Sequence, residues 1–336
     1  MAKVLVVGGA GYIGGHLTDE LIKAGHQVRV YDMLLFEERY LKPVDFVYGD
    51  IRDQQRLLPY VQWADTVVWL AALVGDPACA LSPEATRAIN IDSVRWLVKN
   101  FHGRVINMSS CSVYGAQDGI LTEDSPLNPL SLYAKTKVEC EKIFAEANAI
   151  SFRNGTVFGV GDSYSRIRLD LVVNLLTVKA CLFKRMSVFG GSQYRPLLHV
   201  KDVANAVLPN ITSEHTGVFN LHSENMTMSE VAKKIREQVP DALVEQTDIE
   251  FQDARNYKAS SEKARETFGF RPRYTVEDGI KEIKALVDEG RIRDLTSTRY
   301  SNADYLRPRL LQNITPLGVE FSETFPRASG TSFARR

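Results

Sequence analysis

The sequence predicts an α/β protein built on a doubly wound parallel sheet, with a smaller C-terminal α/β lobe. Two features of the first half lead to this fold class. Short β-branched runs alternate with longer amphipathic stretches, as they do where helices cross over between parallel strands. A glycine-rich turn directly follows the first of these runs. The chain has 336 residues, 44% of them hydrophobic, which is enough material for about two domains.

The first half supplies five predicted strands and four predicted crossover helices. The β-branched runs lie at residues 4–7, 27–31, 46–48, 66–70 and 105–108, and runs of this length are typical of buried strands. The amphipathic stretches lie at residues 13–24, 54–63, 84–100 and 132–147, and each is long enough to cover one face of a sheet. We assign residues 1–155 to this first domain.

The second half of the chain is less regular. A polar loop is expected at 159–165 and a strand at 218–221, with helices at 169–181, 228–239, 261–268 and 276–289. Residues 156–290 should therefore form a smaller lobe, some of whose segments return to the sheet. The last stretch, 291–336, is rich in Arg, Ser and Thr and has weak periodicity, which predicts an extended or partly disordered arm.

The composition disfavours several classes of function. The 41 basic and 41 acidic side chains give a formal net charge of zero, so the chain lacks the long-range field that a binder of nucleic acid or of anionic membranes needs. No apolar run approaches the roughly 20 residues of a transmembrane helix, and no cleavable leader precedes the first strand, which predicts a cytoplasmic protein. The four cysteines are scattered without metal-ligand spacing, so neither disulfides nor a metal site is expected.

The glycine-rich turn has the spacing of a dinucleotide-binding site. Gly9, Gly11 and Gly14 satisfy GxGxxG between a predicted strand and a predicted helix. Glycines at these places permit the turn and let the backbone approach a pyrophosphate, which would lie at the positive N-terminus of the helix. This arrangement predicts a Rossmann-type domain.

Asp32 ends the second predicted strand, at the spacing of the acid that accepts hydrogen bonds from the adenosine ribose. Its carboxylate would repel a 2′-phosphate by roughly 1–4 kcal/mol at a separation of about 4 Å. NAD is therefore the expected cofactor, and NADP is disfavoured.

Three further residues suit proton transfer. Tyr133 and Lys137 are four residues apart in a predicted helix and so share one face. A neighbouring ammonium lowers the pKa of a phenol from its usual value of about 10, which would let Tyr133 act as a general base. Ser110 follows the strand at 105–108, at the sheet edge where open α/β folds bind ligands, and can hydrogen-bond the reacting oxygen.

Together these motifs resemble the extended short-chain dehydrogenases/reductases, and among them the nucleotide-sugar epimerases, dehydratases and reductases. The resemblance spans residues 3–290. It rests on GGAGYIG at 8–14, Asp32, GDI at 49–51, LAA at 70–72, SSCSVYG at 109–115, YAKTK at 133–137 and RPLLHVKDVA at 195–204.

The resemblance implies roles for individual residues. Tyr133 exchanges a proton with a sugar hydroxyl, Lys137 holds the nicotinamide ribose and tunes Tyr133, and Ser110 orders the substrate oxygen. The residues implied to bind the cofactor are Gly8, Gly9, Gly11, Tyr12, Ile13, Gly14, Asp32, Asp50, Ile51, Ala71, Ala72, Asn90, Tyr133 and Lys137. For Asn90, a helix cap or turn residue is an equally good interpretation.

The substrate that the resemblance implies is a nucleotide-diphosphate sugar. Arg195 and Arg255 would hold the diphosphate, to which forked guanidinium groups are well suited, and Asn174 would touch the nucleobase. Thr156 stands where many relatives carry a substrate-contacting Asn, so the sugar pocket is expected to differ from that of the commonest 4-epimerases. The resemblance also implies a homodimer, paired through helices such as those at 84–100 and 132–147.

The predicted reaction is epimerisation through a transient keto-sugar. Bound NAD takes a hydride, from C4, while Tyr133 accepts the hydroxyl proton, and the hydride then returns to the opposite face of the sugar. The same residues suit an alternative, an NAD(P)H-dependent reductase of a ready-made 4-keto sugar nucleotide. A 4,6-dehydratase is disfavoured because Cys111 and Ser112 replace the usual Asp and Glu. A non-catalytic dinucleotide-binding protein is disfavoured because the serine, tyrosine and lysine are all present.

Overall fold

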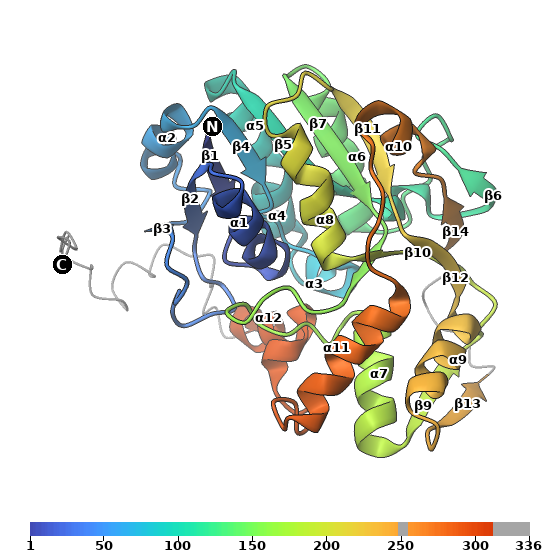
Figure 1. The fold of residues 1–336 in the computed structure, drawn as a ribbon. Helices are drawn as coiled ribbons and strands as arrows, with labels where there is room; N and C mark the ends of the chain where they lie inside the picture. The colour runs from blue at the N-terminus through green and yellow to red at the C-terminus, as the bar shows by residue number, and fades with distance from the viewer. Residues whose placement is uncertain (248–254, 312–336) are drawn as a thin grey trace.

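The computed structural model describes residues 1–247 and 255–311. Its centre is a seven-stranded sheet in the order β11-β7-β5-β4-β1-β2-β3, and every neighbouring pair is parallel (Figure 1). The strands are β1 (Lys3–Val7), β2 (Gln27–Asp32), β3 (Asp45–Tyr48), β4 (Thr66–Trp69), β5 (Arg104–Ser110), β7 (Ala149–Asn154) and β11 (Gly217–Leu221). The doubly wound parallel sheet predicted from the sequence is confirmed.

The direction of winding reverses between β1 and β4. From β1 the chain proceeds to β2 and β3 on one side, and it then fills the other side with β4, β5 and β7. Ligands of open α/β sheets bind outside the carboxyl ends of the strands at such a reversal. The glycine-rich turn, which leaves β1, lies at this point.

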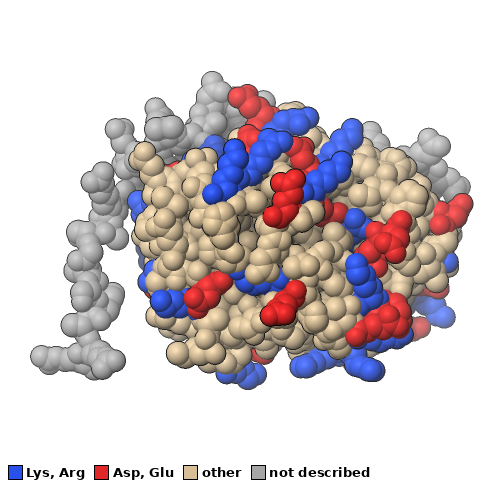
Figure 2. Space-filling view, turned by 90° about the horizontal axis from the view of Figure 1, so that it is seen from above, with Lys and Arg blue, Asp and Glu red and all other residues tan. Residues whose placement is uncertain are grey.

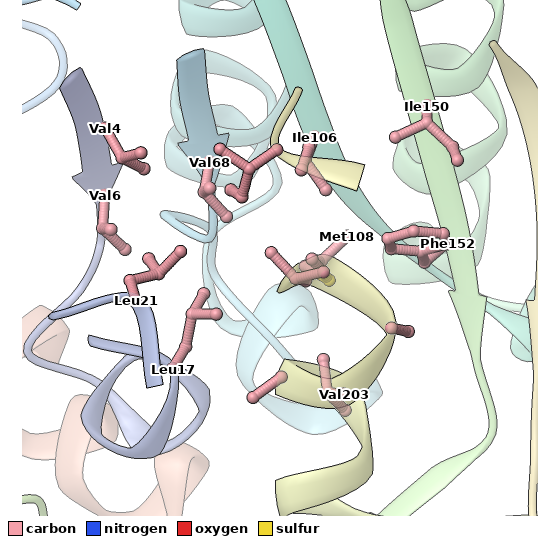
Figure 3. Close-up of a cluster of buried hydrophobic side chains, with 14 of the residues drawn as sticks. Val4, Val6, Leu17, Leu21, Val68, Ile106, Met108, Ile150, Phe152 and Val203 are labelled. Atoms are coloured by element: carbon pink, nitrogen blue, oxygen red, sulfur yellow. The ribbon is translucent and has the colours of Figure 1, made fainter. Parts of the chain in front are cut away.

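Helices cover both faces of the sheet, so its strands are buried on each side. Val4 and Val6 pack with Leu17 and Val203 on one face (Figure 3), while Leu5 and the side chains that alternate with it face the opposite core. The helices are α1 (Tyr12–Lys23), α8 (Val200–Val207) and α10 (Glu262–Phe268) on the first face, and α2 (Gln54–Trp63), α5 (Ser93–Asn100) and α6 (Leu132–Phe144) on the second. Burial on both faces explains why the strands are continuous β-branched runs.

A smaller lobe lies at the carboxyl ends of the strands (Figure 1). Its helices are α7 (Val172–Phe183), α9 (Met228–Gln238) and α11 (Val276–Asp288). Its strands are β8 (Thr156–Phe158), β10 (Tyr194–His199) and β12 (Glu224–Thr227) in one small sheet, and β9 (Arg185–Phe189) with β13 (Leu243–Thr247) in another. A further parallel pair joins β6 (Ala116–Leu121) to β14 (Asn256–Ala259). The strand expected at 218–221 is β11, so this part of the chain does return to the main sheet.

Some helices differ from the sequence prediction. The single helix expected at 84–100 is divided into α4 (Pro83–Arg87), a π-helical turn (Ala88–Asp92) and α5. Two helices were not predicted, α3 (Asp76–Leu81) and α8. A third, α12 (Asn302–Leu311), lies in the stretch expected to be an extended arm and packs against α3.

Within residues 1–247 and 255–311, none of the helices combines the length and the apolar character needed to span a membrane. Basic and acidic side chains are interspersed over the face shown in Figure 2. The four cysteines are free thiols.

Candidate active site

A large cavity lies at the carboxyl ends of the central strands, beside the smaller lobe. Its volume is ≈ 1290 Å³, more than the roughly 300–1,000 Å³ of a typical small-molecule site, which suits a dinucleotide with a second ligand. The predicted site residues that line it are Gly8, Gly11, Tyr12, Ile13, Gly14, Asp32, Asp50, Ile51, Ala71, Ala72, Ser110, Tyr133, Lys137, Thr156, Arg195 and Arg255. The predicted residues outside this lining are Gly9, Asn90 and Asn174.

The turn after β1 is shaped to admit a phosphate. Gly8 has a φ of +82°, and a Cβ there would lie 2.5 Å from the backbone nitrogen of Ala71. A Cβ on Gly14 would lie 2.5 Å from the Cα of Gly9, which itself faces the sheet and brings helix and strand together. Gly11 is the N-cap of α1 and makes no side-chain cap hydrogen bond, so the first N–H groups of this helix are available to an anion. The turn therefore fits the pyrophosphate of NAD.

Asp32 ends β2 in the wall of the same cavity. Its Oδ2 accepts a hydrogen bond from the backbone N–H of Ala10 at 3.0 Å, and its Oδ1 accepts one from Leu34 at 2.7 Å. Burial raises the pKa of Asp32, and these backbone hydrogen bonds act in the opposite direction. The carboxylate is thus held beside the glycine-rich turn, where the adenosine ribose is expected.

Asp32→Ala is expected to relax the discrimination against NADP by about 5- to 1,000-fold, since a repulsion worth roughly 1–4 kcal/mol disappears. Calorimetric titration of NAD and NADP into wild type and variant measures the ratio of their dissociation constants. Asp53→Ala is the matched control, because the Asp53 side chain caps α2 by accepting a hydrogen bond from Arg56. An unchanged ratio in Asp32→Ala would remove this residue from the cofactor site.

Helix α6 and strand β5 bring the three predicted catalytic side chains together. The Ser110 hydroxyl is close enough to the phenol of Tyr133 to lower its pKa in part, and Ser110 Oγ accepts a hydrogen bond from the backbone N–H of Ser112 at 3.2 Å. Lys137 Nζ lies 5.7 Å from the centre of the Tyr133 ring and donates a hydrogen bond to the carbonyl of Met108 at 2.6 Å. The serine, tyrosine and lysine therefore share one wall of the cavity.

The expected lowering of the Tyr133 pKa is wrong for this structure. Burial raises the pKa of Tyr133, nearby Cys79 raises it further, and the Ser110 hydroxyl lowers it only in part. The ammonium of Lys137 is directed at the Met108 carbonyl, and burial lowers its own pKa. Burial favours the neutral form of both groups, an effect that the four-residue spacing cannot reveal.

The predicted substrate residues lie where the smaller lobe meets the sheet. Arg195 donates a hydrogen bond to the backbone carbonyl of Arg255, and Arg255 Nη1 lies 3.5 Å from Asp76 Oδ2. Asp76 also accepts a hydrogen bond from Ser131, the N-cap of α6, at 2.6 Å. Asp76 was not predicted as a site residue. Its position shortly after the end of a central strand, where ligands of open α/β sheets bind, would have indicated it.

Asn90 and Asn174 are placed differently from the prediction. Asn90 Oδ1 accepts from the backbone N–H of Leu73 at 2.8 Å, and its Nδ2 donates to the Leu73 carbonyl at 3.0 Å. Asn174 Oδ1 accepts from Gly159 N–H at 2.9 Å, and its Nδ2 donates to the carbonyl of Arg168 at 2.9 Å. Asn90 Nδ2 also donates to Thr136 Oγ1 at 3.2 Å. Both amides therefore hold loops of the cavity wall through hydrogen bonds to other groups of the protein.

One wall of the cavity comes from the C-terminal segment. Residues 301–303 line it, and Asn302 holds them there. Its backbone N–H donates to Asp170 at 3.0 Å, its Nδ2 donates to the Val74 carbonyl at 2.8 Å, and its Oδ1 accepts from Arg166. Asn302 thus joins the loop before α7 to the loop after β4. The weak periodicity of this stretch gave no sign of that role.

Asn302→Ala is expected to lower the free energy of unfolding by about 1–3 kcal/mol, because the buried groups that it serves on Val74 and Arg166 lose their partner. Urea titration measures the change. Asn100→Ala is the control, since this exposed side chain on α5 bonds only to the carbonyl of Trp96 among the hydrogen bonds described and surface substitutions stay within about 0.5 kcal/mol. Equal effects of the two substitutions would contradict the role given to Asn302.

Several known proteins are similar in sequence to this chain. The sequence profile of the NAD dependent epimerase/dehydratase family matches residues 4–221. The UDP-glucose 4-epimerase of Halalkalibacterium halodurans is 31% identical over 307 residues, which covers 81% of this chain and 91% of that protein. The UDP-glucose 4-epimerase of Lactobacillus helveticus is 28% identical over 335 residues, which covers 83% and 94%.

A solved structure is similar over most of the chain. The structure of MoeE5 in complex with UDP-glucose and NAD superposes with a TM-score of 0.72 at 26% identity, and the match covers 86% of this chain and 99% of that one. The family match itself begins in the first strand, includes the tyrosine helix and ends with the last strand of the main sheet. On this evidence the chain belongs to the NAD-dependent epimerase/dehydratase family.

Proposed function

We propose that this protein is an NAD-dependent nucleotide-sugar epimerase that inverts C4 of a hexose through a transient keto-sugar. The observation that carries the proposal is that Ser110, Tyr133 and Lys137 line the same cavity as the glycine-rich turn. The two relatives named above are UDP-glucose 4-epimerases. A uridine-diphosphate hexose is therefore the substrate class that we propose.

The proposed chemistry divides between the cofactor and the side chains of the wall. NAD, when bound, would accept a hydride from the ring carbon and return it, so that no cofactor is consumed overall. Tyr133 takes the hydroxyl proton and later gives it back, and Ser110 holds the reacting oxygen. The protonated phenol, which burial favours, suits the return step, in which the keto oxygen needs a proton. Lys137 holds the nicotinamide ribose beside Tyr133.

The two arginines suit the diphosphate of the substrate. Arg195 is nearly buried, and its contact with the backbone of Arg255 keeps the two guanidinium groups on one side of the cavity. Forked guanidinium groups bind phosphate oxygens strongly. With the diphosphate held there, the sugar ring can turn and present its opposite face to the returning hydride.

The surroundings of Cys111 argue further against a 4,6-dehydratase. This thiol is fully buried, it donates a hydrogen bond to the Arg153 carbonyl at 3.1 Å, and burial raises its pKa. Ser112 does line the cavity, but a serine hydroxyl does not replace an ionisable carboxylic acid. The 4-keto-sugar reductase stays the alternative, since it would use the same tyrosine, serine and lysine.

Purified protein incubated with a UDP-hexose decides between these two functions. The epimerase is expected to interconvert the C4 epimers without added NADH, and product sugars can be separated by chromatography. Consumption of NADH or NADPH with a 4-keto sugar nucleotide, together with no interconversion, would contradict the epimerase and support the reductase.

We also propose a homodimer, formed through α5 and α6. These helices lie together on one face of the sheet and are joined by an ion pair between Arg95 and Glu139. Light scattering on the protein as it elutes from a size-exclusion column should give the mass of two chains. The mass of one chain would contradict the dimer. The cytoplasmic location and the expectation of neither nucleic-acid nor membrane partners remain predictions.

A further inference from the structure

Three side-chain oxygens of residues in the cavity wall are buried without a hydrogen-bond partner in the described part of the chain. One is Oε1 of Glu37, whose carboxylate is paired with Arg299 through its other oxygen. The other two are the hydroxyl oxygen of Ser112 and the side-chain oxygen of Asn154. Ser112 is 2% exposed and Asn154 is 6% exposed, and both residues line the cavity. Nearly all buried polar atoms of native proteins have a partner, so two such atoms in a cavity wall point to a ligand that supplies one.

Both residues are neighbours of Ser110. Asn154 is the register partner of Ser110 in the parallel pair of β5 and β7, and register partners project to the same face of a sheet. Ser112 donates its backbone N–H to Ser110 Oγ at 3.2 Å. The amide nitrogen of Asn154 donates to Met108 Sδ at 3.4 Å, and its amide oxygen is left for another donor.

The strand order places Asn154 on the side of Ser110 away from the dinucleotide turn. Counted from that turn, the strands follow in the order β1, β4, β5 and β7, with neighbours about 4.8 Å apart. Asn154 ends β7, so it lies one strand beyond Ser110. The chain then enters β8, which begins at Thr156 and pairs with β10, the strand that carries Arg195. A nucleotide sugar that extends from Ser110 to Arg195 would lie along Asn154.

We propose that Asn154 and Ser112 bind a sugar hydroxyl next to the oxidised carbon and thereby determine which sugars react. The inference rests on the proposed function. An amide oxygen only accepts hydrogen bonds, whereas a serine hydroxyl both donates and accepts, so the pair matches a neutral hydroxyl. A phosphate or carboxylate oxygen has no proton to donate to Asn154 and is disfavoured at this pair.

The test compares Asn154→Leu and Ser112→Ala with the wild type on a UDP-hexose and on its 3-deoxy and 6-deoxy analogues. We expect kcat/KM on the complete sugar to fall about 10- to 100-fold, the effect of losing one buried hydrogen bond. On one deoxy analogue the variants and the wild type should agree, since the hydroxyl that the pair binds is already absent. The amount of bound NAD should not change.

Three results would overturn the proposal. They are unchanged kcat/KM on the complete sugar, an equal loss on all three sugars, and a loss of bound NAD, which would assign the pair to the nicotinamide carboxamide. Ser151→Ala is the matched control on β7, because Ser151 accepts a hydrogen bond from Asn107 at 3.0 Å and lies outside the cavity lining. If Asn154→Leu fails to fold, Ser112→Ala carries the same comparison.

A binding measurement separates this proposal from the proposed function. Calorimetry on the NAD-loaded protein compares UDP with the UDP-hexose, and the affinity gained from the sugar should shrink about 10- to 100-fold in Asn154→Leu while UDP binds as before. If the affinity gained from the sugar is the same in variant and wild type, Asn154 and Ser112 do not bind the sugar. Failure of the wild type to interconvert sugars would overturn only the epimerase.

Discussion

Tyr133→Phe is expected to lower kcat for epimerisation by about 100- to 10,000-fold, the range that general acid–base catalysis contributes. The substitution removes only the phenol hydroxyl, in the same cavity wall as Ser110, and the ring stays to fill its place. Bound NAD should be unchanged, because the glycine-rich turn and Asp32 belong to other strands. Initial rates with a UDP-hexose and the NAD released on denaturation measure the two quantities.

Tyr60→Phe is the matched control for this prediction. Tyr60 lies in α2, outside the cavity lining, with its ring centre 5.8 Å from that of Tyr31. Loss of its hydroxyl should leave both rate and bound NAD unchanged. A Tyr133→Phe enzyme that turns over at the wild-type rate would exclude Tyr133 as the proton acceptor.

Arg153→Met is expected to lower the free energy of unfolding by about 3–5 kcal/mol, because it leaves the buried carboxylate of Glu141 without its partner. Arg153 donates to Glu141 through Nε at 2.9 Å and through Nη2 at 2.7 Å. The two side chains are only 4% and 6% exposed. Glu141 follows Lys137 by four residues, so the pair fixes the catalytic helix α6 to β7. Urea titration of the purified variant measures the loss.

The double variant Glu141→Leu with Arg153→Met shows whether the loss comes from an unpaired charge. With both charged groups replaced by apolar ones, stability should recover most of the loss, since well-packed apolar replacements of a buried pair are often neutral or stabilising. A double variant as unstable as Arg153→Met would contradict this explanation and assign the loss to packing.

The strands nearest the N-terminus were predictable because they are apolar on both faces. Val4 and Val6 face one core and Leu5 faces the other, so the local sequence alone marks a buried strand. Strand β7 was not predicted, because Arg153 and Asn154 interrupt its apolar pattern. Arg153 can be buried in this strand because Glu141 neutralises its charge. Asn154 belongs to the cavity wall. Both positions depend on residues brought together by the fold.

The site was predictable where a motif fixes local geometry. The glycine spacing determines the turn after β1, and the sequence placed Tyr133 and Lys137 on one helix face, as the structure has them. For Asn90 the sequence left open a cofactor contact and a cap or turn residue, and it assigned Asn174 to the nucleobase, because the spacing of an asparagine does not tell whether its amide faces a ligand or the backbone. In the structure both amides bond to backbone groups of the cavity wall. The role of Asn302 depends on segments more than 100 residues away.

The route of the hydrogen at C4 tests the proposed hydride transfer most directly. With a UDP-hexose deuterated at C4 and the enzyme in ordinary water, mass spectrometry and NMR should find the deuterium still on C4 of the epimer, because the hydride stays within the active site and returns. Replacement of this deuterium by hydrogen from the solvent would contradict the mechanism, since it would show that the C4 hydrogen leaves as a proton.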